Sequence, residues 1–170
     1  ERRLWEAGSA YQDALGLFRK LAQEKPEEYE VNIAMTLNNL GSVLRDLRRL
    51  NEAKDAYEEA LQLYRAISKK ESHAEAHNMA MALDGWAIVL RDMQRLGEAE
   101  EAMREAVGMY RVLAQAQPQV YEPEMAFRLN NLGLVLNELG KLDESESIYL
   151  EALKLYRRLA REQPQVYEHD

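Results

Sequence analysis

The stretch Leu37-Asn38-Asn39-Leu40-Gly41 returns twice along the 170-residue chain, each time after 46 residues. The later copies read Leu83-Asp84-Gly85-Trp86-Ala87 and Leu129-Asn130-Asn131-Leu132-Gly133. The same offset aligns the rest of the chain without a gap. Self-similarity at a fixed period of this length is typical of stacked repeats. We therefore expect an array of repeats instead of one globular domain.

Each period predicts two helices, because apolar and small residues recur at steps of three and four. One series runs from Ala34 to Leu47 and another from Ala53 to Tyr64. The predicted helices cover 3–24, 28–47, 51–70, 74–93, 97–116, 120–139 and 143–162. The expected fold class is all-α: antiparallel helix pairs that stack into a right-handed α-α superhelix, or solenoid, of seven helices.

These helices predict a single array with three full repeats, at 28–70, 74–116 and 120–162. Residues 3–24 form a half repeat, and residues 163–170 begin a truncated repeat. We call the first helix of each repeat a first-type helix and the second a second-type helix. The helix at 3–24 is of the second type, so we expect the chain to be a segment of a longer array.

Turn residues support these boundaries. Asn51 and Asp143 are expected to cap second-type helices, with Glu146 placed three residues after Asp143 as in a capping box. The longer turns between repeats contain prolines, which end or restart helices. They are Pro26, Pro118 and Pro164, with Ser72 in the remaining place.

Composition agrees with a helical protein. The chain is 46% hydrophobic and 31% charged, with few prolines and glycines, which is too apolar for disorder and too poor in breakers for an all-β chain. A net charge of −8 repels phosphate backbones and anionic lipid, so nucleic acid and membrane partners are not expected. The absence of cysteine suits a reducing compartment, and we expect a cytoplasmic protein.

The repeat resembles the tetratricopeptide repeat in its large, small and aromatic positions. These positions hold Leu37, Leu40, Gly41, Leu44, Ala53, Tyr57 and Ala60 in the first copy. They hold Leu83, Trp86, Ala87, Leu90, Ala99, Met103 and Ala106 in the second, and Leu129, Leu132, Gly133, Leu136, Ser145, Tyr149 and Ala152 in the third. The repeat is longer than the usual one, and in this it is similar to the repeats of kinesin light chains and of bacterial arrays. The resemblance implies binding of a protein or peptide.

In that family the first-type helices line a concave groove that binds peptides. The resemblance carries the groove to Met35, Asn38, Asn39, Ser42 and Arg45, to Met81, Asp84, Ile88 and Arg91, and to Phe127, Asn130, Asn131, Leu134 and Asn137. Carboxamides suit a peptide because each can donate to and accept from a backbone. As an alternative, Asn39 and Asn131 cap or bridge neighbouring turns. Asp84 and Gly85 interrupt the asparagine ladder in the middle copy.

Arg45 and Arg91 could hold a carboxylate of the ligand, but each is followed by an acid, Asp46 or Asp92. We favour pairing within the array. Other charges recur in every copy, which suits contacts between repeats or solvated faces: Arg19, Arg65, Arg111 and Arg157, with Glu6, Glu52, Glu98 and Glu144. The aromatic series of Phe18, Tyr64, Tyr110 and Tyr156 is expected in the core.

No catalytic motif is recognisable, and we expect neither an enzyme nor a cofactor. His73 and His77 lie four residues apart, but Ala74 stands where a zinc protease has its glutamate, and no third metal ligand is evident. The first hypothesis is therefore an interaction scaffold that binds a protein or peptide in its groove.

The alternative is a structural arm of a larger signalling protein, or self-association through the ends of the array. Helix 3–24 lacks the partner helix that would cover Ala7, Ala14 and Phe18, and helix 143–162 lacks the next first-type helix. Exposed apolar faces of this kind favour packing between copies, so a homo-oligomer is possible.

Overall fold

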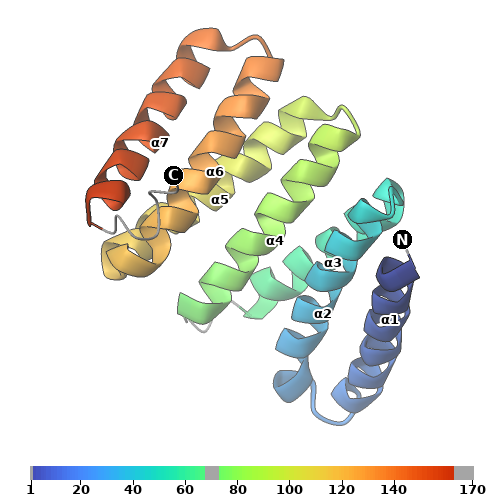
Figure 1. Cartoon of the computed structure of the whole chain (residues 1–170). Helices are drawn as coiled ribbons and strands as arrows, with labels where there is room; N and C mark the ends of the chain where they lie inside the picture. The colour runs from blue at the N-terminus through green and yellow to red at the C-terminus, as the bar shows by residue number, and fades with distance from the viewer. Residues whose placement is uncertain (1, 68–72, 163–170) are drawn as a thin grey trace. The chain divides into compact units, whose positions relative to one another are not determined.

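The structure is a computed structural model that describes residues 2–67 and 73–162. In this part the chain forms seven helices and no strand, which confirms the all-α fold class. They are α1 (Arg2–Ala22), α2 (Pro26–Asp46), α3 (Leu50–Ile67), α4 (His73–Asp92), α5 (Leu96–Ala116), α6 (Pro118–Glu138) and α7 (Leu142–Glu162). They belong to two compact units, residues 1–95 and residues 96–170 (Figure 1).

Where the residues on both sides are described, the helix ends lie within two residues of the predicted ones. Pro26 and Pro118 stand at the first position of α2 and α6, as expected of residues that restart a helix. Ser72, Pro164 and the truncated repeat at 163–170 lie outside the described residues. None of the described helices is long and apolar enough to cross a membrane.

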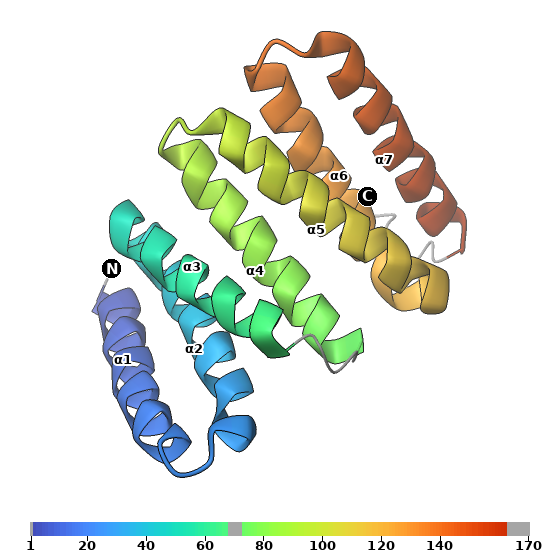
Figure 2. The same cartoon turned by 180° about the vertical axis from the view of Figure 1, so that it is seen from behind.

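In the first unit, α2 packs against both α1 and α3, and α4 packs against α3 and also contacts α2 (Figures 1 and 2). Small residues allow this close approach. Ala53 and Ala60 of α3 are fully buried, and the ring of Tyr57 lies between Gly41 of α2 and Gly85 of α4. The apolar face of α3 is therefore covered from two sides.

In the second unit, α6 packs between α5 and α7. A Cβ atom on Gly133 would lie 2.8 Å from the ring of Tyr149, so α6 and α7 repeat the contact between α2 and α3. Ser145 stands at the position of Ala53, and its buried hydroxyl donates a hydrogen bond of 2.8 Å to the carbonyl oxygen of Gly133. Helix pairing is thus conserved in detail between the two units.

The turn from each first-type to each second-type helix contains a residue with positive φ. These residues are Arg48, Gln94 and Gly140, with φ of 60°, 62° and 74°. After Arg48, the amide of Arg49 donates to the carbonyl of Leu44, as in a Schellman motif. Gly140 is the one of the three that is suited to this conformation by its lack of a side chain.

The expected helix caps, Asn51 and Asp143, lie two residues beyond the positions that flank the helices. Helix α3 begins at Leu50 and α7 at Leu142, so Asn51 and Asp143 lie inside the first helical turn instead of before it. The left-handed residue ends the preceding helix only two residues earlier, which leaves Arg49 and Lys141 in the flanking position. Acidic side chains in the first turn, such as Asp143 and Glu144, still stabilise the helix, because they lie near the positive end of its dipole.

Candidate functional site

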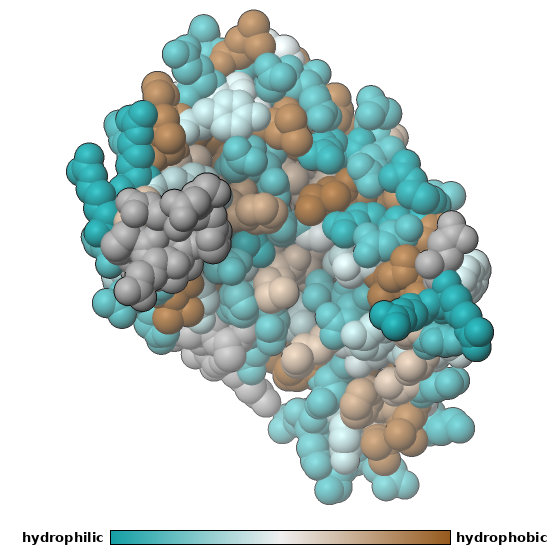
Figure 3. Space-filling view, in the orientation of Figure 1, coloured by the Kyte–Doolittle hydropathy of each residue, from teal (hydrophilic) through white to brown (hydrophobic). Residues whose placement is uncertain are grey.

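One position of the repeat is apolar and exposed in every first-type helix that the structure describes. It holds Met35 on α2, Met81 on α4 and Phe127 on α6. All three belong to the residues that the family resemblance assigns to the groove. Figure 3 shows that apolar side chains lie among hydrophilic ones on the visible surface. An apolar side chain that is left in water at the same slot in each copy is a candidate contact for a partner.

Four polar residues of the first unit interact with the hydroxyl of Tyr57: Ser42, Arg45, Asp46 and Asp84. Burial raises the pKa of Tyr57 to about 12, although the charge of Arg45 and a side-chain hydrogen bond with Ser42 oppose it. The negative charges of Asp84 and Asp46 add to the effect of burial. Ser42 and Arg45, predicted to line the groove, are therefore partly engaged by the core.

Asp84 departs from the role expected for it. Its exposed fraction is only 7%, and it is engaged within the chain, so its side chain is turned into the Tyr57 cluster instead of toward a partner. The neighbouring Gly85 explains this burial, because the missing side chain lets α4 approach Tyr57 closely. Among the other predicted positions, Asn38 and Ile88 are half-buried and Asn39 is exposed.

Arg45 pairs within the array, as favoured from the sequence. Its guanidinium Nη2 lies 2.9 Å from Oδ1 of Asp46, and its Nε donates to the same oxygen at 3.2 Å. Burial opposes the charge of Arg45, but this hydrogen bond and the nearby acids raise its pKa. Arg91 lies 4.0 Å from Asp92, which also pairs with Arg48 at 3.4 Å. These arginines are thus partly neutralised before any ligand binds.

In the second unit, the residues assigned to the groove lie on the first-type helix α6. Phe127 and Asn130 are exposed, and Leu134 is half-buried. The guanidinium of Arg128 lies 5.2 Å from the centre of the Phe127 ring. Asn131 is half-buried and engaged within the chain, which fits its alternative role in the array itself.

Two recurring arginines connect successive second-type helices. Arg19 on α1 binds Glu59 on α3 at 2.5 Å, and Arg111 on α5 binds Glu151 on α7 at 2.8 Å. The expectation of contacts between repeats is confirmed for these two arginines, but their partners, Glu59 and Glu151, lie outside the recurring glutamate series. In both pairs the arginine and the glutamate are 40 residues apart, and this shared spacing could have identified the partners from the sequence. The expected glutamates bind other residues, for example Glu144 to Arg104.

The aromatic series lies mainly in the core, as predicted. Tyr64 and Tyr110 are almost fully buried, and Phe18 is half-buried and stacks on Tyr29 with ring centres 6.3 Å apart. Ala7 and Ala14, predicted to lack cover, are also half-buried.

No metal cluster is found among residues 2–67 and 73–162. No group of three or more His, Asp or Glu side chains is placed to hold a metal ion in this part. His77 is engaged within the chain, and the side chain of His73 lies outside the described part.

Comparison with known proteins supports the repeat at two levels. Models of the tetratricopeptide repeat match residues 32–111 and 128–164, which together make up more than half of the chain. Comparison with curated protein sequences finds no match.

Among solved structures, the chain is similar to BtubC (BKLC) from P. vanneervenii, with a TM-score of 0.68 and 20% sequence identity. The likeness covers 94% of this chain but spans only 59% of the length of that protein, and at this identity it shows the fold alone. Together with the family matches and the repeated helix pairs, it leads to one conclusion. The chain belongs to the tetratricopeptide-repeat family.

Proposed function

We propose that this protein binds a segment of a partner protein on the exposed faces of its first-type helices. Tetratricopeptide repeats generally mediate protein–protein interaction and are typically not enzymes. The observation that carries the proposal is the shared apolar slot of Met35, Met81 and Phe127, which lies on the surface in each helix. Methionine suits such a surface because its flexible thioether adapts to different side chains.

Polar residues beside the slot suggest how a backbone would be held. Asn38 follows Met35 by three residues, and Asn130 follows Phe127 by three, so each pair lies on one helix face. An apolar contact next to a carboxamide fits an extended segment, whose side chains alternate and whose backbone offers donors and acceptors. On α4, where Asp84 is buried, the next residues assigned to the groove along the helix are the half-buried Ile88 and Arg91, and Arg91 lies 4.0 Å from Asp92.

The test uses a displayed library of random peptides selected against the intact chain. Peptides that bind are measured by fluorescence anisotropy against the native protein and against Met35→Glu, Met81→Glu and Phe127→Glu. Removing one buried apolar contact costs about 1.5–3 kcal/mol, so at least one variant of the three should bind roughly tenfold or more weakly. Asn38→Arg and Asn130→Arg test the carboxamides in the same assay.

Val112→Glu is the matched control, because Val112 is exposed on the second-type helix α5 and is not among the residues assigned to the groove. Circular dichroism confirms that each variant keeps its helix content. Selected peptides that bind the native protein and all five variants of the first-type helices equally would move the site elsewhere. A library that yields no binder for the native chain would also count against the proposal.

A further inference from the structure

The middle of each first-type helix is almost free of charged residues. Residues 31–44 of α2 contain no Asp, Glu, Lys or Arg, although the chain as a whole is 31% charged. The corresponding residues 77–90 of α4 contain one charged residue, and residues 123–136 of α6 contain two. The second-type helix α3, by contrast, has six charged residues among its 18. We call residues 31–44, 77–90 and 123–136 the neutral segments.

The three charges inside the neutral segments are engaged within the protein. Asp84 is buried in the Tyr57 cluster, with an exposed fraction of 7%. Arg128 forms an ion pair with Glu124, and its guanidinium also lies 4.8 Å from the centre of the Tyr110 ring. A partner that contacts the neutral segments therefore meets no charge that is both exposed and unpaired.

The exposed residues of the neutral segments are also uncharged. They are Asn32, Met35 and Asn39 on α2, Met81 on α4, and Phe127 and Asn130 on α6. Exposure to solvent does not require this choice, since half of the exposed residues of α3 are charged. Depletion of charged residues where methionine and aromatic residues are retained is typical of the core of a protein interface.

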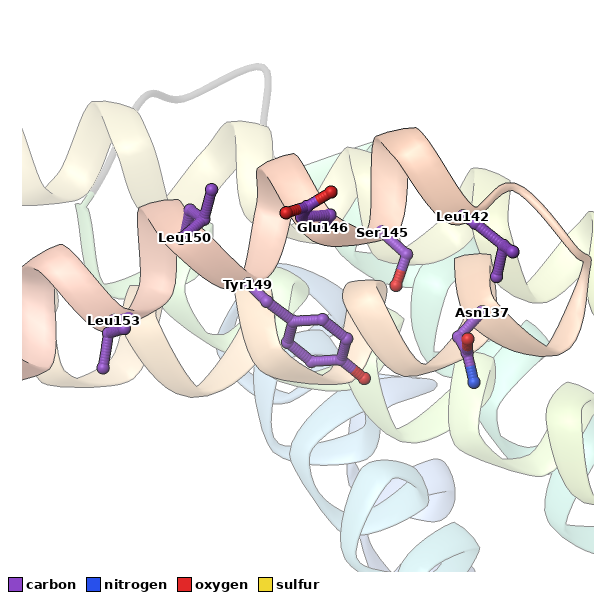
Figure 4. Close-up of a pocket in the computed structure, with 7 residues that line it drawn as sticks. All are labelled: Asn137, Leu142, Ser145, Glu146, Tyr149, Leu150 and Leu153. Atoms are coloured by element: carbon purple, nitrogen blue, oxygen red, sulfur yellow. The ribbon is translucent and has the colours of Figure 1, made fainter.

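Charged side chains return at both ends of the first-type helices. Helix α2 has two glutamates in its first turn, and Arg45, directly after residues 31–44, pairs with Asp46. On α6, Asn137 follows residues 123–136 and borders a shallow pocket together with Glu146 of α7 (Figure 4). Charges thus frame the neutral segments and do not line them.

We propose that the partner segment is itself uncharged where it contacts the neutral segments, with apolar side chains on the slot and amide or hydroxyl side chains beside the asparagines. This chemistry rests on the proposed function, since it concerns the same helix faces. A charged side chain buried there would lose water without gaining an opposite charge.

Neither sign of charge on the partner is favoured. An acidic segment is repelled by the net charge of −8, and Arg45 is already paired with Asp46. A basic segment finds in the neutral segments only carboxylates that are buried, as in Asp84, or paired, as in Glu124. An uncharged segment avoids both costs.

Three displayed peptide libraries of matched apolar content test this chemistry against the intact chain. Their polar positions hold only Asn, Gln, Ser and Thr in the first library, Asp and Glu in the second, and Lys and Arg in the third. We expect the tightest binders from the first library. Their Kd should change less than about twofold between about 50 mM and about 500 mM NaCl, because salt screens charges. Aspartate or lysine introduced at a contacting position of such a peptide should each weaken binding at least about tenfold.

Asn130→Arg supplies a charge that the native face lacks. It should strengthen the binding of at least one aspartate-substituted peptide about tenfold, and this gain should decrease with salt. Gln115→Arg is the matched control, because Gln115 is exposed on α5 outside the neutral segments and receives the same charge. It should leave the aspartate-substituted peptides as weak as they are with the native chain.

Met35→Glu and Phe127→Glu separate the chemistry of the partner from the position of the site. If acidic or basic peptides bind the native chain most tightly and lose affinity in these variants, the first-type helices bind a partner but the partner is not uncharged. If uncharged peptides bind the variants as tightly as the native chain, the proposed function itself is wrong. Equal effects of Asn130→Arg and Gln115→Arg on the aspartate-substituted peptides would also overturn the proposal.

Discussion

The ring of Tyr57 occupies the space that a side chain on Gly85 would need. A Cβ atom at Gly85 would lie 2.5 Å from Cζ of that ring, and one at Gly41 would lie 2.8 Å from its other edge. Tyr57 is almost fully buried, so its ring has no free space into which it could move. The packing of α3 between α2 and α4 thus depends on a missing side chain on each neighbour.

Replacing Gly85 with alanine should therefore destabilise the protein, although alanine is the better helix former. Overpacking of a filled core costs about 1–3 kcal/mol, and we expect a loss of this size in the free energy of unfolding from urea titration. Gly108→Ala on α5 is the control, because a Cβ atom there meets no atom within 4 Å. It should stabilise the helix by roughly 0.5–1 kcal/mol. Equal effects at the two sites would contradict the packing argument.

Substitutions at two of the left-handed turn residues, Gln94 and Gly140, should change the free energy of unfolding in opposite directions. Gln94 has φ of 62°, a conformation that costs a residue with a side chain about 1–2 kcal/mol. Gln94→Gly should raise the unfolding free energy by about 1 kcal/mol, and Gly140→Ala should lower it by a similar amount. Thermal and urea unfolding of the two variants beside the native chain measure both changes. Shifts of the same sign would show that the turn conformation does not govern stability here.

Protonation of Glu100 should lower the free energy of unfolding at acidic pH. Burial opposes its charge, but hydrogen bonds from Lys141 at 2.7 Å and Arg104 at 2.9 Å lower its pKa below the ordinary 4.5. Because the folded pKa is lower than the unfolded one, the stabilisation is fully present above pH 4.5 and is lost as pH falls through the folded pKa.

Glu100→Gln should lower the free energy of unfolding at neutral pH by about 1–3 kcal/mol and flatten its decline in acid. Urea titrations at a series of pH values measure both effects. Glu101→Gln, at an exposed position on the same helix, is the control and should follow the native curve. A Glu100→Gln curve parallel to the native one at every pH would remove Glu100 as the source of the dependence.

Helix positions and core aromatics were predictable because they follow from the period alone. Ala60, Tyr64 and Tyr110 lie on the faces that three- and four-residue spacing assigns to the core, and they are buried. The turns were less predictable, since glycine marks the left-handed residue only at Gly140, whereas Arg48 occupies the same conformation without a sequence signal.

Exposure to solvent was predictable at Met35, Met81 and Phe127 but not at Asp84. Met35 and Met81 are exposed where the repeat resemblance placed them. Asp84 belongs to the core cluster instead, because the position next to it is a glycine and α4 approaches Tyr57 more closely than a copy with asparagine would allow. Whether a polar side chain faces a ligand or the core depends on such tertiary contacts, which the spacing of one sequence does not reveal.

Tyr57 should also limit stability at alkaline pH. Its pKa in the folded protein is about 12, above the ordinary 10, so the neutral hydroxyl stabilises the fold below pH 10 and this contribution is lost as pH rises through 12. Tyr64, with a pKa also raised to about 12 by burial, contributes in the same direction.

Tyr57→Phe should lose the hydrogen bond with Ser42, at a cost of about 1 kcal/mol at neutral pH, and its free energy of unfolding should decline less steeply above pH 10. Urea titrations between pH 8 and pH 12 measure the slope, with Tyr11→Phe, at a half-buried position on α1, as the matched control. If Tyr57→Phe and Tyr11→Phe decline with the native slope, ionisation of Tyr57 does not contribute to alkaline unfolding.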